Sequence, residues 1–208
     1  GIYCRNTDIT REIRNRLLQL ATTLENEGYN LSTLVMGTQT GTHVDAPLSF
    51  SNSGETIDNM ELDFFLGEAV VVRVTDKKAD EAITLEDIEP YKEEICEGKI
   101  VLFNTNWYKT RGTDEFFHHP YVNGDVAKYL VDNGVRFIGI DTINADQTGG
   151  TEFPVHDLFS EKRLMIGENW AFFDQIDFER PYVIALPMKL IGCDGFACKT
   201  IAVQWEEE

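Results

Sequence analysis

Four short runs of apolar residues recur along the chain and form its most regular pattern. They cover residues 69–74, 100–103, 137–140 and 183–185, and most are rich in β-branched side chains. Strands that are buried on both faces have this nearly continuous pattern, whereas half-exposed strands alternate polar and apolar residues. We expect the four runs to form a central sheet that is covered on both sides.

In the segment 8–24 the apolar residues are spaced more widely than in these four runs. Its apolar positions include Ile13, Leu17, Leu18, Leu20, Ala21 and Leu24, which are close to helical spacing. Thr10 suits the N-cap, the residue at which a helix begins. The spacing predicts a helix over this segment.

Two further helices are indicated by their end signals. Thr84 and Asp87, three residues apart, have the spacing of a capping box, in which each side chain bonds the backbone of the other. Residues 125–133 precede Gly134, a residue type that often ends a helix. Helices that alternate with buried strands predict an α/β fold, and 208 residues predict a single domain over residues 1–208.

The composition is strongly acidic. Thirty-six acidic and 18 basic residues give a formal net charge of −18. This charge repels phosphate backbones and anionic membranes, so we expect neither nucleic acid nor a membrane as a partner. Four cysteines without CxxC spacing and the lack of a long apolar run favour free thiols in a soluble, cytoplasmic protein.

Candidate chemistry begins at His43 and Asp45. In an extended segment these two side chains project to the same face and can reach one ion. Gly41 permits close backbone approach, and Pro47 favours extended geometry at the residue before it. A second histidine and acid follow downstream, where Glu168 comes twelve positions after His156. The polar segment 50–59 is expected to be a loop beside this site, suited to act as a lid.

These motifs resemble the signature of a known family, the cyclase family of metal-dependent hydrolases, which includes bacterial kynurenine formamidases and isatin hydrolases. The signature HxGTHxDxPxH corresponds to Gln39-Thr40-Gly41-Thr42-His43-Val44-Asp45-Ala46-Pro47-Leu48-Ser49. The resemblance continues through Asn104-Thr105-Asn106-Trp107, His119-Pro120-Tyr121, Gly139-Ile140-Asp141-Thr142, Phe153-Pro154-Val155-His156, Leu186-Pro187-Met188-Lys189 and Cys193-Asp194-Gly195. The chain resembles a diverged member of this family.

The resemblance implies a fold, a cofactor and an assembly. The fold is a swivelling β/β/α fold, with a central barrel-like mixed sheet flanked by helices. The cofactor is a divalent metal, zinc or manganese, as one or two ions. The implied assembly is a homodimer or a higher homo-oligomer, and the partner of the site is a small-molecule substrate. The implied metal ligands are His43, Asp45, His156 and Glu168, with Gln39 at the position of the first signature histidine.

Two signature positions differ in this chain. Gln39 offers only a neutral carbonyl oxygen, which is a weaker metal ligand than imidazole. Ser49 replaces the last histidine, and its hydroxyl can bond a substrate or water but cannot shuttle protons near neutral pH. Ser49 and Glu168 are the candidate catalytic residues, with Glu168 assisting proton movement where the metal leaves it free.

Trp107 and His119 are the candidate substrate-binding residues. A tryptophan can stack on an aromatic substrate, and His119 lies in an aromatic loop with Pro120. A structural role in the core or in the loop is the alternative for both residues.

The sequence predicts an enzyme that hydrolyses a small amide, or a cyclic amide or ester, with a metal-activated water. The bond expected to break is a non-peptide C–N bond, as in an arylformamidase. The alternative from another class is a catalytically silent relative that binds a small ligand, for which Gln39 and Ser49 argue. A metal-dependent lyase or lactonase is a third hypothesis on the same site.

Overall fold

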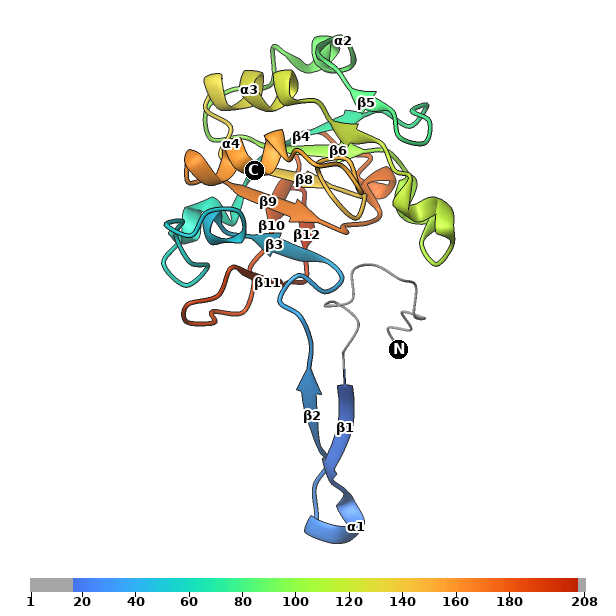
Figure 1. Ribbon diagram of the computed structural model, residues 1–208, viewed down its shortest axis with the longest axis vertical. Helices are drawn as coiled ribbons and strands as arrows, with labels where there is room; N and C mark the ends of the chain where they lie inside the picture. Colours follow the sequence, from blue (N-terminus) through green and yellow to red (C-terminus); the bar gives the residue numbers. More distant parts are fainter. Residues whose placement is uncertain (1–16, 206–208) are drawn as a thin grey trace.

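An eight-stranded mixed sheet forms the centre of the computed structural model, which describes residues 17–205 (Figure 1). The strand order is β11-β3-β9-β8-β6-β4-β10-β12. Its four middle strands are parallel: β4 (Leu66–Arg73), β6 (Ile100–Asn104), β8 (Phe137–Ile140) and β9 (Met165–Glu168). The outer strands run antiparallel to their inner neighbours: β3 (His43–Asp45), β10 (Tyr182–Ile184), β11 (Gly195–Ala197) and β12 (Ile201–Val203).

The sheet is covered on both faces, as the apolar runs predict. Along β6, Val101 and Phe103 belong to one core cluster and Ile100 and Leu102 to the other. The first cluster is closed by three helices: α2 (Leu85–Ile88), α3 (Gly124–Asp132) and α4 (Pro154–Glu161). The second cluster is closed by loops and by β10. All four predicted strands are confirmed within this sheet.

The remaining short elements connect the sheet and its helices. A second pair of strands joins β5 (Ala82–Ile83) to β7 (Tyr121–Val122). The 3-10 helices are η1 (Pro47–Ser49), η2 (Leu62–Phe64), η3 (Glu89–Tyr91), η4 (Trp107–Thr110), η5 (Asp114–Phe117) and η6 (Phe173–Gln175). Between residues 17 and 205, no helix has the length and apolar character needed to cross a bilayer.

Both helices predicted from end signals are confirmed. Thr84 and Asp87 form the capping box at the start of α2. Helix α3 begins one residue earlier than predicted, because the side chain of Asn123 accepts a hydrogen bond from the backbone of Asp125. The chain turns away at Gly134, whose positive φ of 80° suits glycine.

A two-stranded arm projects from the body of the molecule (Figure 1). Strand β1 (Leu17–Thr22) pairs with β2 (Leu31–Val35), and α1 (Leu24–Glu27) lies at the tip. The predicted helix over 8–24 is therefore wrong from residue 17 to residue 22, and residues 8–16 lie outside the described residues. Closely spaced leucines fit either structure, and the pairing with β2 decides in favour of a strand.

Candidate metal centre

The candidate site begins at the pairing of β3 with β9. His43 lies directly opposite Glu168 in this antiparallel pair, and Asp45 lies opposite Ile166. Because alternate residues of a strand point to opposite faces, His43 and Asp45 share one face and Val44 packs into the core on the other. The structure thus brings together three residues that the sequence singled out.

Ligand atoms of these three buried residues all lie within 4.8 Å of one another. Nε2 of His43 is 3.6 Å from Oδ1 of Asp45 and 3.6 Å from Oε2 of Glu168. Water is largely excluded, because His43, Asp45 and Glu168 are exposed by only 2%, 4% and 5%. The arrangement is a dry group of one imidazole and two carboxylates.

Two polar atoms of this group have no hydrogen-bond partner: Nε2 of His43 and Oδ1 of Asp45. Buried polar atoms are rarely left unpaired in folded proteins. The other ring nitrogen of His43, Nδ1, lies 2.7 Å from the carbonyl oxygen of Gly41 and donates to it. This bond leaves a lone pair on Nε2, which is how proteins commonly orient a histidine toward a metal.

His156 reaches the same group from helix α4. Its Nε2 lies 3.1 Å from Oε1 of Glu168 and 3.9 Å from Oδ2 of Asp45, and its Nδ1 lies 2.7 Å from Oδ2 of Asp146. Asp146 also accepts from the backbone N–H groups of Val155 and His156. One carboxylate therefore caps the first turn of α4 and orients the imidazole that this turn carries.

The carboxylates favour positive charge at the cluster. Burial lowers the pKa of His43, but Asp45 and Glu168 outweigh burial and raise this pKa well above its usual value. For His156, burial is again outweighed, by Glu168, Asp146 and Asp45, and its pKa rises to about 10. Burial alone would raise the pKa of Glu168, but the two imidazoles hold it far below its usual value. A divalent cation supplies the same positive charge as the imidazolium protons.

Trp170 supports the backbone of His43. Its indole Nε1 donates to the carbonyl oxygen of His43 at 3.0 Å, and the ring is almost fully buried. The ring lies against Gly139 and Gly167, and a Cβ atom at Gly167 would overlap it. Both glycines are needed because they leave room for this indole.

Gln39 and Ser49 both bond to Asp194 rather than to the cluster. Nε2 of Gln39 donates to Oδ2 of Asp194 at 3.2 Å, and Oγ of Ser49 donates to the backbone carbonyl of Asp194 at 2.7 Å. Thr38 donates to the other carboxylate oxygen. The two signature positions that differ thus share one partner, which fastens the segment before and after β3.

Trp107 and His119, the candidate substrate-binding residues, are held by their own loops. The indole of Trp107 donates to the carbonyl oxygen of Glu115. His119 is buried, and its ring nitrogens lie 2.7 Å from the carbonyl oxygen of Pro120 and 2.7 Å from Oγ1 of Thr148. Burial lowers the pKa of His119, so its ring is neutral and joins two loops.

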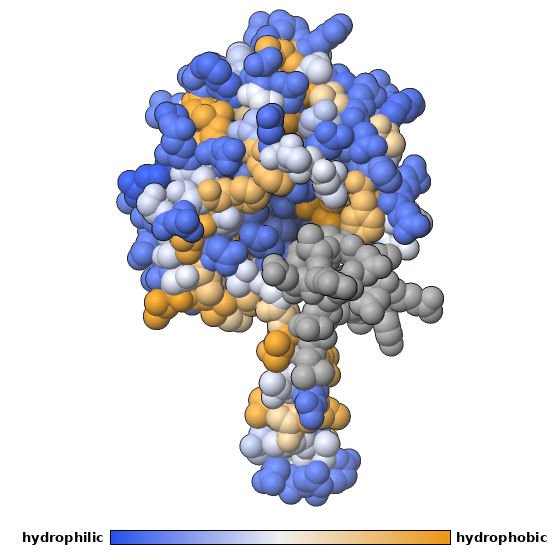
Figure 2. Space-filling view, viewed as in Figure 1, coloured by the Kyte–Doolittle hydropathy of each residue, from blue (hydrophilic) through white to orange (hydrophobic). Residues whose placement is uncertain are grey.

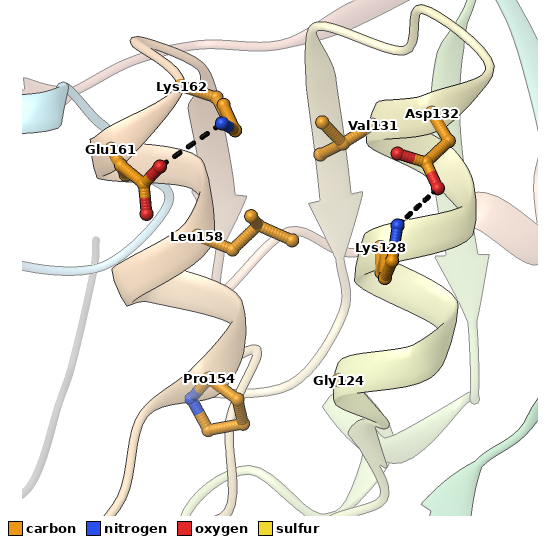
Figure 3. A pocket seen from close by; sticks show the side chains of 8 residues that line it. All are labelled: Gly124, Lys128, Val131, Asp132, Pro154, Leu158, Glu161 and Lys162. Atoms are coloured by element: carbon orange, nitrogen blue, oxygen red, sulfur yellow. Dashed lines mark hydrogen bonds and ion pairs between the residues drawn. The ribbon is translucent and has the colours of Figure 1, made fainter.

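A separate groove of about 500 Å³ lies between α3 and α4 (Figure 3). Its charged side chains pair along their own helices, Lys128 with Asp132 and Lys162 with Glu161. Val131 and Leu158 lie between these pairs (Figure 3). A cavity of about 340 Å³ nearby is lined partly by Asp146, the residue behind His156.

Sequence reasoning missed two parts of the site. Asp146 was not among the candidate residues, although its carboxylate contacts the ring of His156. Phe50 was expected only as part of a loop, yet its ring stacks on His156 with centroids 4.0 Å apart. No local signal points to Asp146, because it lies eight residues before Pro154, the start of α4, whereas an N-cap residue directly precedes its helix.

The donor set fits a divalent transition metal. Imidazole nitrogen and carboxylate oxygen are common ligands of zinc and manganese, and the two orphaned atoms face the same place. A cluster of this kind, on two neighbouring strands of a curled mixed sheet, defines a metal-dependent class of protein. The chain belongs to the cyclase family: residues 7–147 match the family model described as "Putative cyclase".

Curated relatives and solved structures agree with this family. Kynurenine formamidase of Bacillus cereus is 28% identical over 180 residues, covering 85% of this chain and 81% of the relative. Kynurenine formamidase of Geobacillus thermodenitrificans is 28% identical over 171 residues, covering 82% and 78%. A Bacillus stearothermophilus structure, described as a "predicted metal-dependent hydrolase", is 27% identical with a TM-score of 0.74, covering 90% of this chain and 86% of that one.

The fold is also that of isatin hydrolase A from Labrenzia aggregata. That structure has a TM-score of 0.84 at 22% identity and covers 97% of this chain and 88% of its own. The expected barrel-like mixed sheet flanked by helices is confirmed, and so is the expected family of metal-dependent hydrolases.

Proposed function

We propose that this protein hydrolyses a C–N bond of a small amide or cyclic amide, with an ion held by His43, Asp45 and Glu168. The observation that carries the proposal is the pair of orphaned atoms, Nε2 of His43 and Oδ1 of Asp45, which face Glu168 in a dry cluster. The named activities of the relatives, kynurenine formamidase and isatin hydrolase, support the substrate class.

A bound zinc or manganese ion would polarise a carbonyl group and lower the pKa of water from about 15.7 toward about 7. The chain's own residues hold the ligands in position and supply a proton to the leaving group. Oε1 of Glu168 accepts from the backbone N–H of Ala145 at 2.7 Å, which fixes the carboxylate. Nε2 of His156 faces Glu168, and Asp146 on the other side of the ring stabilises the imidazolium form, in which Nε2 carries a proton. This proton is available to the nitrogen that leaves when the C–N bond breaks.

An aromatic wall lies beside His156 and favours a flat, apolar substrate group. Phe50 stacks on the imidazole and contacts Phe153 with ring centroids 5.6 Å apart. Phe50 is still 37% exposed, so part of its ring remains available for contact. An aryl amide matches this wall better than an aliphatic amide does.

The test separates ion binding from proton transfer. We expect wild-type protein to contain near-stoichiometric metal by mass spectrometry and to hydrolyse an aryl formamide. His43→Ala should lose both the metal and the activity, because it removes a ligand. His156→Ala should keep the metal but lose about 10²–10⁴-fold in kcat, the usual contribution of a positioned acid or base.

His118→Ala is the matched control, because the His118 ring is exposed and pairs with Asp80 outside the cluster. It should retain both metal and activity. Wild-type protein that binds no added metal and hydrolyses none of the amides would contradict the proposal. It would support the alternative of a catalytically silent relative that binds a small ligand. Loss of metal in His156→Ala would make His156 a ligand instead of a proton carrier.

A further inference from the structure

Asp194 accepts hydrogen bonds from residues on both sides of β3. Its carboxylate accepts from Oγ1 of Thr38 at 2.9 Å and from Nε2 of Gln39 at 3.2 Å, both before the strand. Its backbone carbonyl accepts from the N–H of Ala46 at 2.8 Å and from Oγ of Ser49 at 2.7 Å, both after the strand. We call these five residues the clamp, because they fasten both ends of the strand that carries two of the ligands.

Asp194 is itself held on both sides along the chain. Before it, the backbone N–H of Gly192 donates to Oδ1 of Asp58 at 2.9 Å. After it, Gly195 of β11 lies directly opposite Asp45 of β3. The position of Asp194 is thus fixed by the body of the molecule, and the clamp transfers this position to β3.

The clamp reaches both ligands of β3. The carbonyl oxygen of Gly41, just after the first half of the clamp, lies 2.7 Å from Nδ1 of His43 and orients the imidazole. Ala46 directly follows Asp45, so its bond to Asp194 fixes the peptide beside the second ligand. Partners that orient metal ligands in this way typically contribute about 10–100-fold to metal affinity.

The arm, residues 17–35, shows why this fastening is needed. Figure 1 shows the arm projecting from the body, and Figure 2 shows it as a narrow column below the body. Strand β2 ends at Val35, three residues before Thr38. A displacement of the arm would pass along the chain to His43 if the segment between them were not bound to the body. The bonds of Thr38 and Gln39 to Asp194 make this attachment before the chain reaches the ligand.

Gln39 suits the clamp better than it suits an ion. Its amide nitrogen donates to a carboxylate, and hydrogen bonds to a charged acceptor are stronger than those between neutral groups. Its amide oxygen is neutral and a weaker ligand for zinc than imidazole or carboxylate. The stronger of the two interactions is the one that the structure contains.

We propose that Asp194 is a positioning residue for the metal cluster, and that Gln39 acts through Asp194 and is not a ligand. The inference rests on the proposed function, in which His43, Asp45 and Glu168 hold an ion. It explains how the chain uses both positions at which it differs from the family signature, since Gln39 and Ser49 are members of one clamp.

A double-mutant cycle on metal affinity tests the inference. Calorimetric titration with zinc chloride or manganese chloride gives the dissociation constants of wild type, Asp194→Ala, Gln39→Ala and the double variant. Asp194→Ala should raise the dissociation constant about 10–100-fold. Gln39→Ala should raise it less, because Thr38 still bonds to Asp194. The double variant should stay within about 2-fold of Asp194→Ala, because both changes remove the same bond.

Two outcomes of the cycle would overturn the inference. A double variant that binds the ion more weakly than this would show that Gln39 acts on the ion directly. An unchanged dissociation constant in Asp194→Ala, with only a lower unfolding free energy of the ion-free protein, would make its role merely structural. Asp194→Asn keeps the side-chain volume and one accepting oxygen, so it carries the same cycle if Asp194→Ala does not fold.

Asp58→Ala is the matched control, because it also removes a carboxylate that fastens the chain beside Asp194, but one that bonds to Gly192 outside the clamp. It should keep the wild-type dissociation constant. A loss of affinity as large as that of Asp194→Ala would assign the effect to the lost charge and overturn the inference. Wild-type protein that binds neither ion would instead overturn the proposed function, and the inference with it.

Discussion

Buried polar side chains gather at the carboxyl ends of the parallel strands. Asp141 follows β8 and is completely buried. It accepts from the backbone N–H groups of Thr105 and Asn106 and from the hydroxyl of Thr105. The carboxylate thereby fastens the loop after β6 to the end of β8. Burial nevertheless raises the pKa of Asp141 to about 6, against the effect of these hydrogen bonds.

Asp141 should make the folded protein lose stability as the pH rises from about 4 to about 6. In this range the folded carboxyl keeps a proton that the unfolded chain, with its pKa of about 3.9, releases. The shift of roughly two units corresponds to about 3 kcal/mol of unfolding free energy, and the loss is complete above pH about 6. Urea unfolding at several pH values measures this loss of unfolding free energy.

The comparison variant is Asp141→Asn, whose unfolding free energy should fall less over the same pH range. Asp132→Asn, at an exposed side chain of α3, should follow the wild-type profile. Identical pH profiles for wild type and Asp141→Asn would contradict the expectation.

Single residues of the site were predictable only where a local motif carries them. The spacing of His43 and Asp45 was sufficient to place both on one face of a strand, because the period of a strand is two. The contacts of Asp146 with His156 and of Trp170 with His43 join residues 10 and 127 positions apart. Such contacts depend on the tertiary fold, and no periodicity of the sequence encodes them.

At the scale of elements, the three-residue strand β3 depends on its two neighbours. It lies between β9 and β11, and Gly195 of β11 is opposite Asp45. A Cβ atom at Gly195 would overlap the carbonyl oxygen of Val44. The glycine therefore lets β11 approach the strand that carries two residues of the cluster.

Gly195→Ala should displace β11 from β3. We expect a loss of about 1–3 kcal/mol in unfolding free energy, as for other overpacked sites, and weaker metal binding because Asp45 moves. Thermal unfolding and metal titration measure the two effects. Gly37→Ala is the control, because a Cβ atom there meets only Oγ1 of Thr40 at 3.4 Å. It should stay within about 1 kcal/mol of wild type, and an equally stable Gly195→Ala would contradict the expectation.

Elements with buried partners were predicted better than exposed ones. The apolar runs around Val101 and Ile138 were correctly predicted as strands, because short and nearly continuous apolar runs are typical of strands covered on both faces. The leucines of β1 fit either a helix or a strand, and their spacing alone favours a helix. What selects the strand is its pairing with β2.

At the scale of the whole molecule, the net charge of −18 opposes any self-association. Two such chains repel each other at contact, while exposed apolar side chains of the arm, such as Leu18 and Leu34, favour association. Salt screens the first effect, since the Debye length falls from about 10 Å at 0.1 M to about 3 Å at 1 M, and it does not weaken apolar contact. The balance of the two effects sets the strength of the homodimer that the family resemblance implies.

The dimer should tighten as salt is added. Between about 0.05 M and about 0.5 M sodium chloride we expect the dissociation constant to fall, on the order of 10-fold or about 1.4 kcal/mol. Sedimentation equilibrium at both concentrations measures it. A dimer that loosens in salt would instead be held by ion pairs.

The position of β3 in the sheet also determines when the cluster can form during synthesis. His43 is made long before β9 and β11, the two strands between which β3 lies. A nascent chain therefore carries His43 and Asp45 without their neighbours until residues 165–197 have left the ribosome. The cluster therefore cannot form before β9 and β11 have been made, and binding of an ion by His43 and Asp45 would report that these two strands are in place.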